Sequence, residues 1–320
     1  MRARALVLLL ALLAACSNPP KPVAPLVPAS TPTPGRPAPA MVQVENAPDS
    51  RPHSGLQNAD LVYEYLTEGG ITRFTVIYFD PSGSGKIGPV RSARLVTLRL
   101  VKSYSGVLFY SGASDKVQGL IWDSKIPNYS EGSNGGKYFK RDSSRVAPHN
   151  LYSSGDQLKS GVSDSNAKVT YTLPSSGEPS ATGDGQVTKF SFAQTDVHSV
   201  SYAYDSGSKT YQYTTDGGPE IDTDNSSQPL KITNVVLIRV AHHDAGYTED
   251  VLGENGIDFD LQGTGKADVY TRGQHFAAGW DLSDPAKPLR LTTADGKDFT
   301  LPQGLTWIHL VDPNMAVQAG

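Results

Sequence analysis

Two arginines, Arg91 and Arg94, are the residues of this chain best suited to bind an anion. They follow the Gly-Pro dipeptide at 88–89 and precede a run with apolar residues at helical spacing from Leu95 onward. Both would therefore lie near a helix N-terminus, where the helix dipole favours an anion, and an arginine fork matches carboxylate or phosphate geometry. The alternative is ordinary ion pairing with carboxylates nearby in the sequence, namely Asp60, Glu64 or Glu68.

The turn after an expected strand at 107–110 is a second candidate site. Ser114 and Asp115 follow this strand and suit the N-cap and the first turn of a helix. In open α/β sheets, ligands bind beyond the carboxyl ends of the strands, where exposed backbone N–H groups can hold an anion. A capped strand-to-helix turn without any ligand is the alternative interpretation.

Groups that could move protons lie in the same half of the chain. His149 and Asn150 follow a proline within the segment 147–152, and an imidazole can act as acid, base or hydrogen-bond donor. Glu68 and Asp115 are further candidates for an acid or a base. No Gly-x-Ser-x-Gly pattern lies between a strand and a helix in this half, which argues against a serine hydrolase. A purely structural histidine is the alternative.

We expect no metal site and no cofactor. His242 and His243 are neighbours on an expected strand, so their side chains point to opposite faces and make a poor chelate. Asp258 and Asp260 precede two glycines but lack the ligand spacing and the final glutamate of a calcium loop. The chain has one cysteine, Cys16, which excludes multi-cysteine metal sites and an intrachain disulfide.

This cysteine also marks the processing site that we expect near the start of the chain. Arg2 and Arg4 precede the apolar run 5–15, which is too short to span a bilayer and is typical of a secretory signal peptide. Small residues stand directly before Cys16, as in a bacterial lipobox. We therefore expect cleavage after residue 15 and lipidation of Cys16 by diacylglycerol and a further acyl chain such as palmitate. Two or more acyl chains anchor a protein stably to a membrane, so the mature protein would be extracytoplasmic and membrane-tethered.

The segment 16–40 is predicted to be a linker between this anchor and a folded body. Residues 17–40 hold nine prolines and almost no charge. Such a composition cannot bury a core and tends toward the extended polyproline II conformation. The folded body would then run from residue 41 to residue 320.

The distribution of charge favours two domains in this body. Residues 41–160 carry 14 lysines and arginines against 11 acidic residues, whereas residues 161–320 carry 10 against 21. Strand and helix patterns alternate in the first half, and only strand patterns occur in the second. We predict a mixed α+β fold, with an N-terminal α/β domain at 41–173, a mostly antiparallel all-β domain at 188–320 and a linker between them. The net charge of −4 argues against nucleic-acid binding.

Six short segments of the first half form an ordered set of motifs. They are 51–56 (RPHSGL), 59–64 (ADLVYE), 68–74 (EGGITRF), 87–94 (IGPVRSAR), 138–142 (YFKRD) and 147–152 (APHNLY). Together they resemble the YerB-type bacterial lipoproteins, a family of unknown function. The resemblance implies a lipid-anchored envelope protein with an N-terminal α/β domain and a C-terminal β domain, and it supplies no reaction. It marks as motif positions Glu68, Arg73, Arg91, Arg94, His149 and Asn150.

Three functions are compatible with these observations, and none fixes an oligomeric state. The favoured function is a non-catalytic module that binds an anionic envelope component or a partner protein. Its ligand-binding residues would be Arg73, Arg91, Arg94 and Ser114. An alternative is an envelope enzyme acting on phosphate or glycan linkages, with protons moved by Glu68, Asp115 or His149 beside Asn150. The third is a scaffold that recruits envelope proteins.

Overall fold

A computed structural model of the chain describes residues 34–173 and 176–320. The predicted signal peptide, Cys16 and most of the predicted linker lie outside these residues. The described chain joins the folded body before residue 41, since the backbone N–H of Gly35 donates to Val169 and that of Ala38 donates to Ala167, both at 3.0 Å. Within the described residues, no helix is long and apolar enough to cross a membrane.

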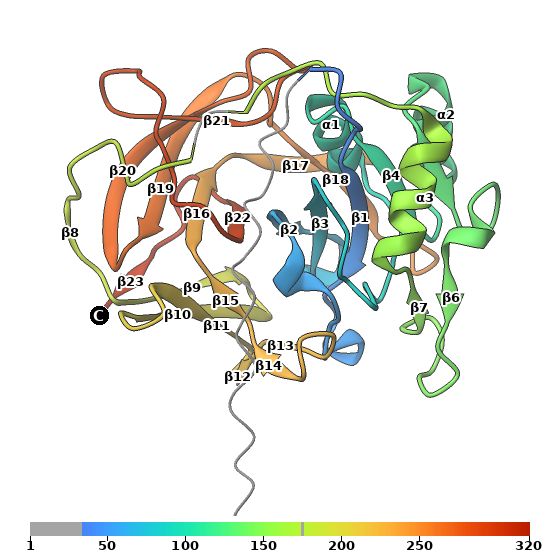
Figure 1. Cartoon of the computed structure of the whole chain (residues 1–320), viewed down its shortest axis with the longest axis horizontal. Coiled ribbons are helices and arrows are strands. Elements are labelled where there is room, and N and C mark those ends of the chain that lie inside the picture. Colours follow the sequence, from blue (N-terminus) through green and yellow to red (C-terminus); the bar gives the residue numbers. More distant parts are fainter. Residues whose placement is uncertain (1–33, 174–175) are drawn as a thin grey trace, which may run out of the picture.

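A mixed sheet of eleven strands forms the centre of the molecule (Figure 1). Its strands follow one another in the order β21 (Arg290–Thr292), β20 (Gln274–Asp281), β19 (Thr264–Thr271), β16 (Asn234–Arg239), β22 (Thr306–Val311), β2 (Leu61–Leu66), β3 (Thr72–Tyr78), β1 (Ala40–Glu45), β4 (Val107–Tyr110) and β5 (Asn128–Ser130), with β8 (Gly185–Gln186) paired to β20. Strands β1, β4 and β5 are parallel to one another, as are β16, β22 and β2.

Both halves of the sequence contribute to this sheet. Strand β2 of the first half pairs in parallel with β22 of the second, from Leu61 opposite Thr306 to Glu64 opposite His309. The sheet therefore continues across the predicted domain boundary, and the boundaries at residues 173 and 188 stay predictions. Figure 1 shows the three α-helices together at one end of the molecule and β19, β20 and β21 at the other.

The remaining elements pack around the central sheet. A second, antiparallel sheet contains β12 (Gly218–Pro219), β11 (Thr210–Thr215), β10 (His198–Asp205), β9 (Lys189–Thr195) and β23 (Gln318–Ala319), with β15 (Lys231–Ile232) paired to β11. Three small hairpins are β6 (Lys140–Arg141) with β7 (Leu151–Tyr152), β13 (Ile221–Asp222) with β14 (Gln228–Pro229), and β17 (His242–Thr248) with β18 (Asn255–Phe259). The helices are α1 (Leu95–Ser103), α2 (Asp115–Ser124) and α3 (Gly155–Ser165), and short 3-10 turns lie at Pro48–Ser50, Leu56–Asn58, Glu68–Gly70 and Gly136–Tyr138.

The central strands bury side chains on both faces, which explains their nearly continuous apolar sequences. Side chains alternate along each strand, so Val62 of β2 enters one core and Tyr63 the other. The first core packs α3 and the six-stranded sheet against one face. The second packs α1, α2 and Phe259 of the β17–β18 hairpin against the opposite face.

The structure confirms the predicted fold class, an N-terminal α/β part followed by a mostly antiparallel β part. Ser114 caps α2 and Ser154 caps α3, each by accepting a hydrogen bond from a first-turn N–H. The segment 176–187, predicted as a linker, packs against the second half, since Gly177 donates its N–H to Leu301 and Arg272 pairs with Glu178.

Candidate functional site

The predicted site residues gather at the carboxyl ends of the parallel strands β1 and β4. The loop before α1 carries Arg91 and Arg94, and the turn after β4 leads into α2. Backbone hydrogen bonds join these two segments, from the N–H of Ala93 to Gly112 at 2.9 Å and from the N–H of Ser111 to Arg91 at 3.1 Å. Both helices begin at this edge, which is where open α/β sheets bind their ligands.

A buried carboxylate organises the exposed part of the site. Glu45, the last residue of β1, lies 3.2 Å through Oε1 from Nε of Arg91 and 2.8 Å through Oε2 from Nδ1 of His149. The side chain of Glu45 is 3% exposed, whereas those of Arg91 and His149 are 32% and 23% exposed. Among the described residues, no hydrogen bond is formed by the terminal nitrogens of Arg91 or by Nε2 of His149. One carboxylate thus holds a guanidinium and an imidazole whose outer nitrogens face away from it.

Arg94 lies deeper than Arg91 and is paired on two sides. Its Nε donates to Oε2 of Glu68 at 2.7 Å, and its Nη1 lies 3.5 Å from Oε1 of Glu249. Glu249 comes from the loop of the β17–β18 hairpin, in the second half of the chain. Burial raises the pKa of Glu249, and the charge of Arg94 opposes this shift. The ion pairing that the sequence offered as an alternative therefore holds for Arg94 with Glu68.

Arg73, on β3, adds a third guanidinium behind these two. It is almost fully buried and donates from Nη1 to the backbone carbonyl of Ser92 at 3.0 Å. Burial, and next the charge of Arg94, lower the pKa of Arg73 to about 9, so the group stays protonated at neutral pH. We refer to the whole assembly as the Glu45 cluster, which comprises Glu45, Glu68, Arg73, Arg91, Arg94, His149 and Glu249.

The other predicted site residues lie at the margin of this cluster. Ser114 caps α2 and also lies close enough to Glu249 to hold down the pKa of that carboxyl. Asp115 is exposed in the first turn of α2. The side-chain amide of Asn150 accepts a hydrogen bond from Nη1 of Arg141 at 2.7 Å and donates to Arg145, so it supports the loop that carries His149.

The sequence interpretation did not identify the two carboxylates that complete the cluster, Glu45 and Glu249. Glu45 ends an apolar run, which gives no sign that an arginine and a histidine meet there. Glu249 reaches Arg94 only because the β17–β18 hairpin packs against α1, and no local pattern encodes that contact. The weak metal motifs are also explained by local contacts, since Asp258 pairs with Arg99 and His243 faces Asp260.

A second glutamate, Glu64, lies on the opposite face of the central sheet and is fully buried. Its Oε1 accepts from Thr72 at 2.9 Å and lies 2.8 Å from Nε2 of His198, and its Oε2 accepts from Trp307 at 2.8 Å and Tyr213 at 3.1 Å. His309 lies 3.5 Å away. We refer to this group as the Glu64 network, which comprises Glu64, Thr72, His198, Tyr213, Trp307 and His309.

The Glu64 network holds a charged carboxylate in the interior. Burial by itself disfavours the charge of Glu64, but His309, His198 and Trp307 outweigh it and lower the pKa of this carboxyl to about 2. Burial lowers the pKa of His309 to about 4, so this imidazole is neutral at neutral pH. Burial also opposes the charge of His198, but the hydrogen bond that His198 makes to the Glu64 carboxylate, together with the charge of Glu64, outweighs burial and raises the pKa of His198.

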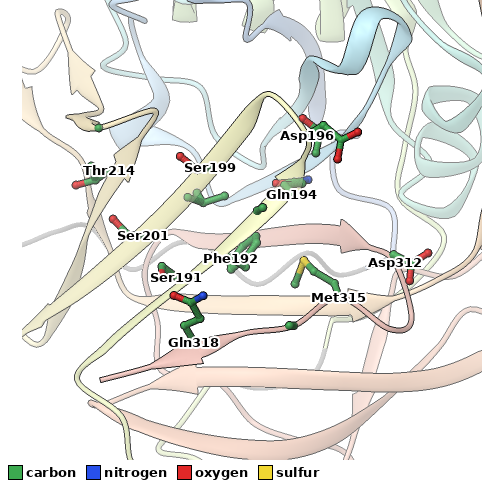
Figure 2. A pocket seen from close by; sticks show the side chains of 15 residues that line it. Ser191, Phe192, Gln194, Asp196, Ser199, Ser201, Thr214, Asp312, Met315 and Gln318 are labelled. Carbon is green, nitrogen blue, oxygen red and sulfur yellow. The ribbon is translucent and has the colours of Figure 1, made fainter.

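A hollow of about 700 Å³, whose lining includes neither glutamate, lies between β9, β10 and the C-terminal segment (Figure 2). Figure 2 shows Asp196 and Asp312 toward one end of the hollow and Gln318 toward the other. Hydroxyl groups of Ser199 and Ser201 line it, and its lining contains two carboxylates and no cationic side chain. This lining does not suit an anion.

Comparisons with known proteins place the chain in a family. A model described as the N-terminal domain of a protein of unknown function, DUF3048, matches residues 27–168, and the C-terminal domain model of the same family matches residues 189–308. The chain belongs to the DUF3048 family. The motif residues Glu68, Arg73, Arg91, Arg94 and His149 all fall within its N-terminal domain.

Relatives of this DUF3048 protein include YerB of Bacillus subtilis (strain 168), whose name classes it as a lipoprotein. The two sequences are 28% identical over 293 residues, which is 85% of this chain and 81% of YerB. A crystal structure of the YerB protein from Bacillus subtilis matches with a TM-score of 0.72 and 26% identity, over 88% of this chain and 93% of that one. The resemblance to the YerB-type lipoproteins predicted from the sequence is thereby confirmed.

Proposed function

We propose that this protein is a lipid-anchored extracytoplasmic module that binds an anionic group of a cell-envelope component at the Glu45 cluster. The site would act by binding, with Arg91 and His149 as the groups that contact the ligand. Arg73 and Arg94 lie behind them, each with partners of its own, and contribute their charge to the field at the site.

The observation that carries this proposal is the free outer edge of the Arg91 and His149 pair. Glu45 occupies only Nε of Arg91 and Nδ1 of His149, so both side chains are held in position with donors left over. A guanidinium with two free terminal nitrogens can form paired hydrogen bonds to a phosphate or carboxylate. Since both side chains are held by Glu45 before a ligand arrives, less conformational entropy is lost on binding.

Pyrophosphate binding by the full-length protein tests the proposal, with inorganic pyrophosphate as the probe in isothermal titration calorimetry. Arg91→Ala removes the exposed fork, and Arg290→Ala serves as a matched control because Arg290 is also partly exposed and paired with aspartates. A charged hydrogen bond contributes about 1.5–3 kcal/mol, so Arg91→Ala should weaken binding by about tenfold or more. Equal affinity in the two variants would refute the role of Arg91.

The lipid anchor is supported by the lipobox-like sequence ending at Cys16 and by the lipoprotein name of the relative YerB. We expect metabolic labelling with an alkyne fatty acid to mark the wild-type protein, which would sediment with membranes. Cys16→Ser should lose the label and appear in the soluble fraction. A Cys16→Ser variant that is still labelled would contradict anchoring at this residue.

A second candidate function is supported by the contact between Glu45 and His149. A carboxylate on Nδ1 orients an imidazole so that Nε2 faces outward, which is the arrangement of a general base. Beside Arg91, such a base could act on a phosphate ester of the envelope. Steady release of the aryl alcohol from an aryl phosphate diester, which leaves the phosphate monoester as the other product, would favour this enzymatic function over binding alone if it is lost in His149→Gln but kept in Arg290→Ala.

A further inference from the structure

A second hollow, separate from the Glu45 cluster, lies between the β6–β7 hairpin and the start of α3. It measures about 550 Å³, a size typical of small-molecule sites. Its cationic lining residues are Lys86, Lys140 and Arg141, and Asp142 is the one carboxylate in the lining. We call it the cationic cleft. Lys86 belongs to the same segment as Arg91, but no cleft residue forms a hydrogen bond or ion pair with Glu45, Arg91 or His149 in the described structure.

Two of the three cations are held in fixed positions. Nζ of Lys86 lies 2.5 Å from Oδ2 of Asp142 and 3.9 Å from the centre of the Tyr152 ring. Arg141 binds Glu131 with Nε at 2.8 Å and Nη2 at 2.6 Å. These contacts offset part of the positive charge while fixing where it lies, and an arranged cluster of this kind favours a specific ligand over diffuse counterions.

The third cation, Lys140, leaves the cleft with an excess of positive charge. Lys140 is exposed on β6 and has no ion-pair partner among the described residues. Within the lining, three cations face one carboxylate, Asp142; outside it, Glu131 pairs with Arg141, and Asp224 accepts from the backbone N–H groups of Gly85 and Lys86. The hollow in Figure 2 has the opposite character, with two aspartates and no cation. Of these two hollows, the cationic cleft is the one that suits an anion.

Hydroxyl groups and a helix end complete the lining. Ser153 and Ser154 line the cleft, and Ser154 is the N-cap of α3, an eleven-residue helix. The positive end of the helix dipole therefore points toward the same hollow as the lysines. Ser143 and Gln157 add polar groups that can bind hydroxyls. The lining thus combines charge for a phosphate with neutral donors and acceptors for a hydroxylated body.

We propose that the cationic cleft is a second binding site, which takes a phosphate ester of a polyol or sugar. Lys86 and Lys140 bind the phosphate, and the serine and glutamine groups bind the hydroxylated part. This site goes beyond the function proposed for the Glu45 cluster because it uses different residues. Such a phosphate ester can belong to a soluble molecule or to a phospholipid headgroup, and both sources share this chemistry.

Glycerol 3-phosphate and phosphatidylglycerol vesicles test the two sources with the full-length protein. Binding of glycerol 3-phosphate, followed by calorimetry, identifies a soluble ligand. The vesicle arm uses the full chain with Cys16→Ser, which lacks the proposed anchor; its binding to phosphatidylglycerol vesicles but not to phosphatidylcholine vesicles, followed by co-sedimentation, identifies a headgroup. Either result that depends on the cleft lysines supports the proposal, and binding of neither probe overturns it.

Lysine variants test whether the probe that binds does so in the cationic cleft. Lys140→Ala should weaken it about tenfold, and Lys86→Ala combined with Lys140→Ala by about 100-fold. Lys266→Ala is the matched control, since Lys266 is exposed on β19 and has no ion-pair partner among the described residues, and it should leave affinity unchanged. Folding of each variant is checked by its thermal unfolding midpoint. Unchanged affinity in a folded double variant would overturn the cleft as the site.

The variants also separate this proposal from the function proposed above. Arg91→Ala should leave binding of glycerol 3-phosphate intact, whereas it should weaken binding of pyrophosphate. If Arg91→Ala abolishes binding of both probes and the lysine double variant changes neither, the cleft proposal fails and the Glu45 cluster is the anion site. If the lysine variant alone has an effect, the cleft proposal stands and the Glu45 cluster proposal fails.

Discussion

The molecule contains two buried glutamates with histidine partners, Glu64 and Glu45. They differ in whether their partners keep nitrogen atoms that can bind a ligand. Glu64 receives hydrogen bonds on both oxygens from groups that are themselves buried, including Trp307 and Tyr213. Glu45 is equally buried, but its partners Arg91 and His149 are partly exposed and keep free nitrogens. A buried carboxylate can therefore be surrounded by buried partners only, as Glu64 is, or can hold partners that reach solvent and keep nitrogens for a ligand, as Glu45 does.

The Glu64 network connects elements from both halves of the chain. Glu64 lies on β2, His198 on β10 and Trp307 on β22, so its hydrogen bonds cross from the central sheet to the six-stranded sheet. A fully satisfied buried network rigidifies a core, whereas an unpaired buried charge is costly. We therefore assign Glu64 to stability and Glu45 to ligand contact.

The largest effect is expected for Glu64→Ala. It leaves His198, Trp307 and Tyr213 without their buried acceptor, and breaking a buried pair of this kind costs about 3–5 kcal/mol in free energy of unfolding. Glu45→Ala should cost less than about 1.5 kcal/mol because Arg91 and His149 can turn to water. Urea denaturation measures the free energy of unfolding of both variants. If the two variants lose the same free energy of unfolding, the Glu64 network and the Glu45 cluster do not differ in their contribution to stability.

Acid sensitivity is the next largest expected effect, and it belongs to His309. Its pKa is about 4 in the folded protein and 6.5 in the unfolded chain, so the unfolded chain binds the extra proton first as pH falls. Stability that depends on neutral His309 is therefore present above pH 6.5 and is lost between pH 6.5 and pH 4. The loss should be on the order of 1–3 kcal/mol.

His309→Gln measures this contribution. Glutamine cannot titrate, so the variant should show a flatter dependence of the urea midpoint on pH between 6.5 and 4.5 than the wild-type protein. The low pKa of Glu64 acts in a separate window, because its contribution is present above pH 4.5 and falls away toward pH 2. If the urea midpoints of the wild-type protein and of His309→Gln change with pH in parallel, a group other than His309 controls the loss of stability in acid.

Local sequence signals predicted one strand beside the site but not β1, the strand that carries Glu45. The strand at 107–110 was found at its observed bounds, since a continuous apolar run encodes burial directly. Ser114 was identified as a helix start because an N-cap is a local hydrogen bond. Arg91 and Arg94 were placed near the start of α1 because apolar residues recur at helical spacing from Leu95 onward.

The long-range contacts could not be predicted in this way. Glu45 meets His149 across about a hundred residues of sequence, and Arg94 meets Glu249 only through the β17–β18 hairpin. The cationic cleft depends on Lys86 lying beside the β6–β7 hairpin. Each contact follows from how the strands are ordered in the sheet, which side-chain periodicity does not specify. The sequence therefore identified the arginines and the histidine but not the carboxylates that hold them.

A smaller effect is expected for Glu45→Gln, which should strengthen pyrophosphate binding rather than weaken it. Glutamine keeps an acceptor for Arg91 but removes a negative charge that repels an anionic ligand. Pyrophosphate binding by the full-length protein should therefore become about three- to tenfold tighter, with little change in stability. Glu64→Gln is the matched control on the other face of the sheet and should leave pyrophosphate affinity unchanged. Weaker binding by Glu45→Gln would mean that the charge of Glu45 is needed to hold Arg91.

The smallest effect is expected for Arg91→Lys, which separates charge from geometry at the exposed pair. Lysine keeps the positive charge, but its single ammonium group would be occupied by Glu45 and would leave no fork for the ligand. Pyrophosphate affinity should fall about threefold, less than in Arg91→Ala, while the dependence of affinity on salt stays close to that of the wild type because the charge is retained. If Arg91→Lys binds as weakly as Arg91→Ala, paired hydrogen bonding dominates recognition. If it binds like the wild type, the site recognises charge alone, and the free terminal nitrogens of Arg91 are not what distinguishes Glu45 from Glu64.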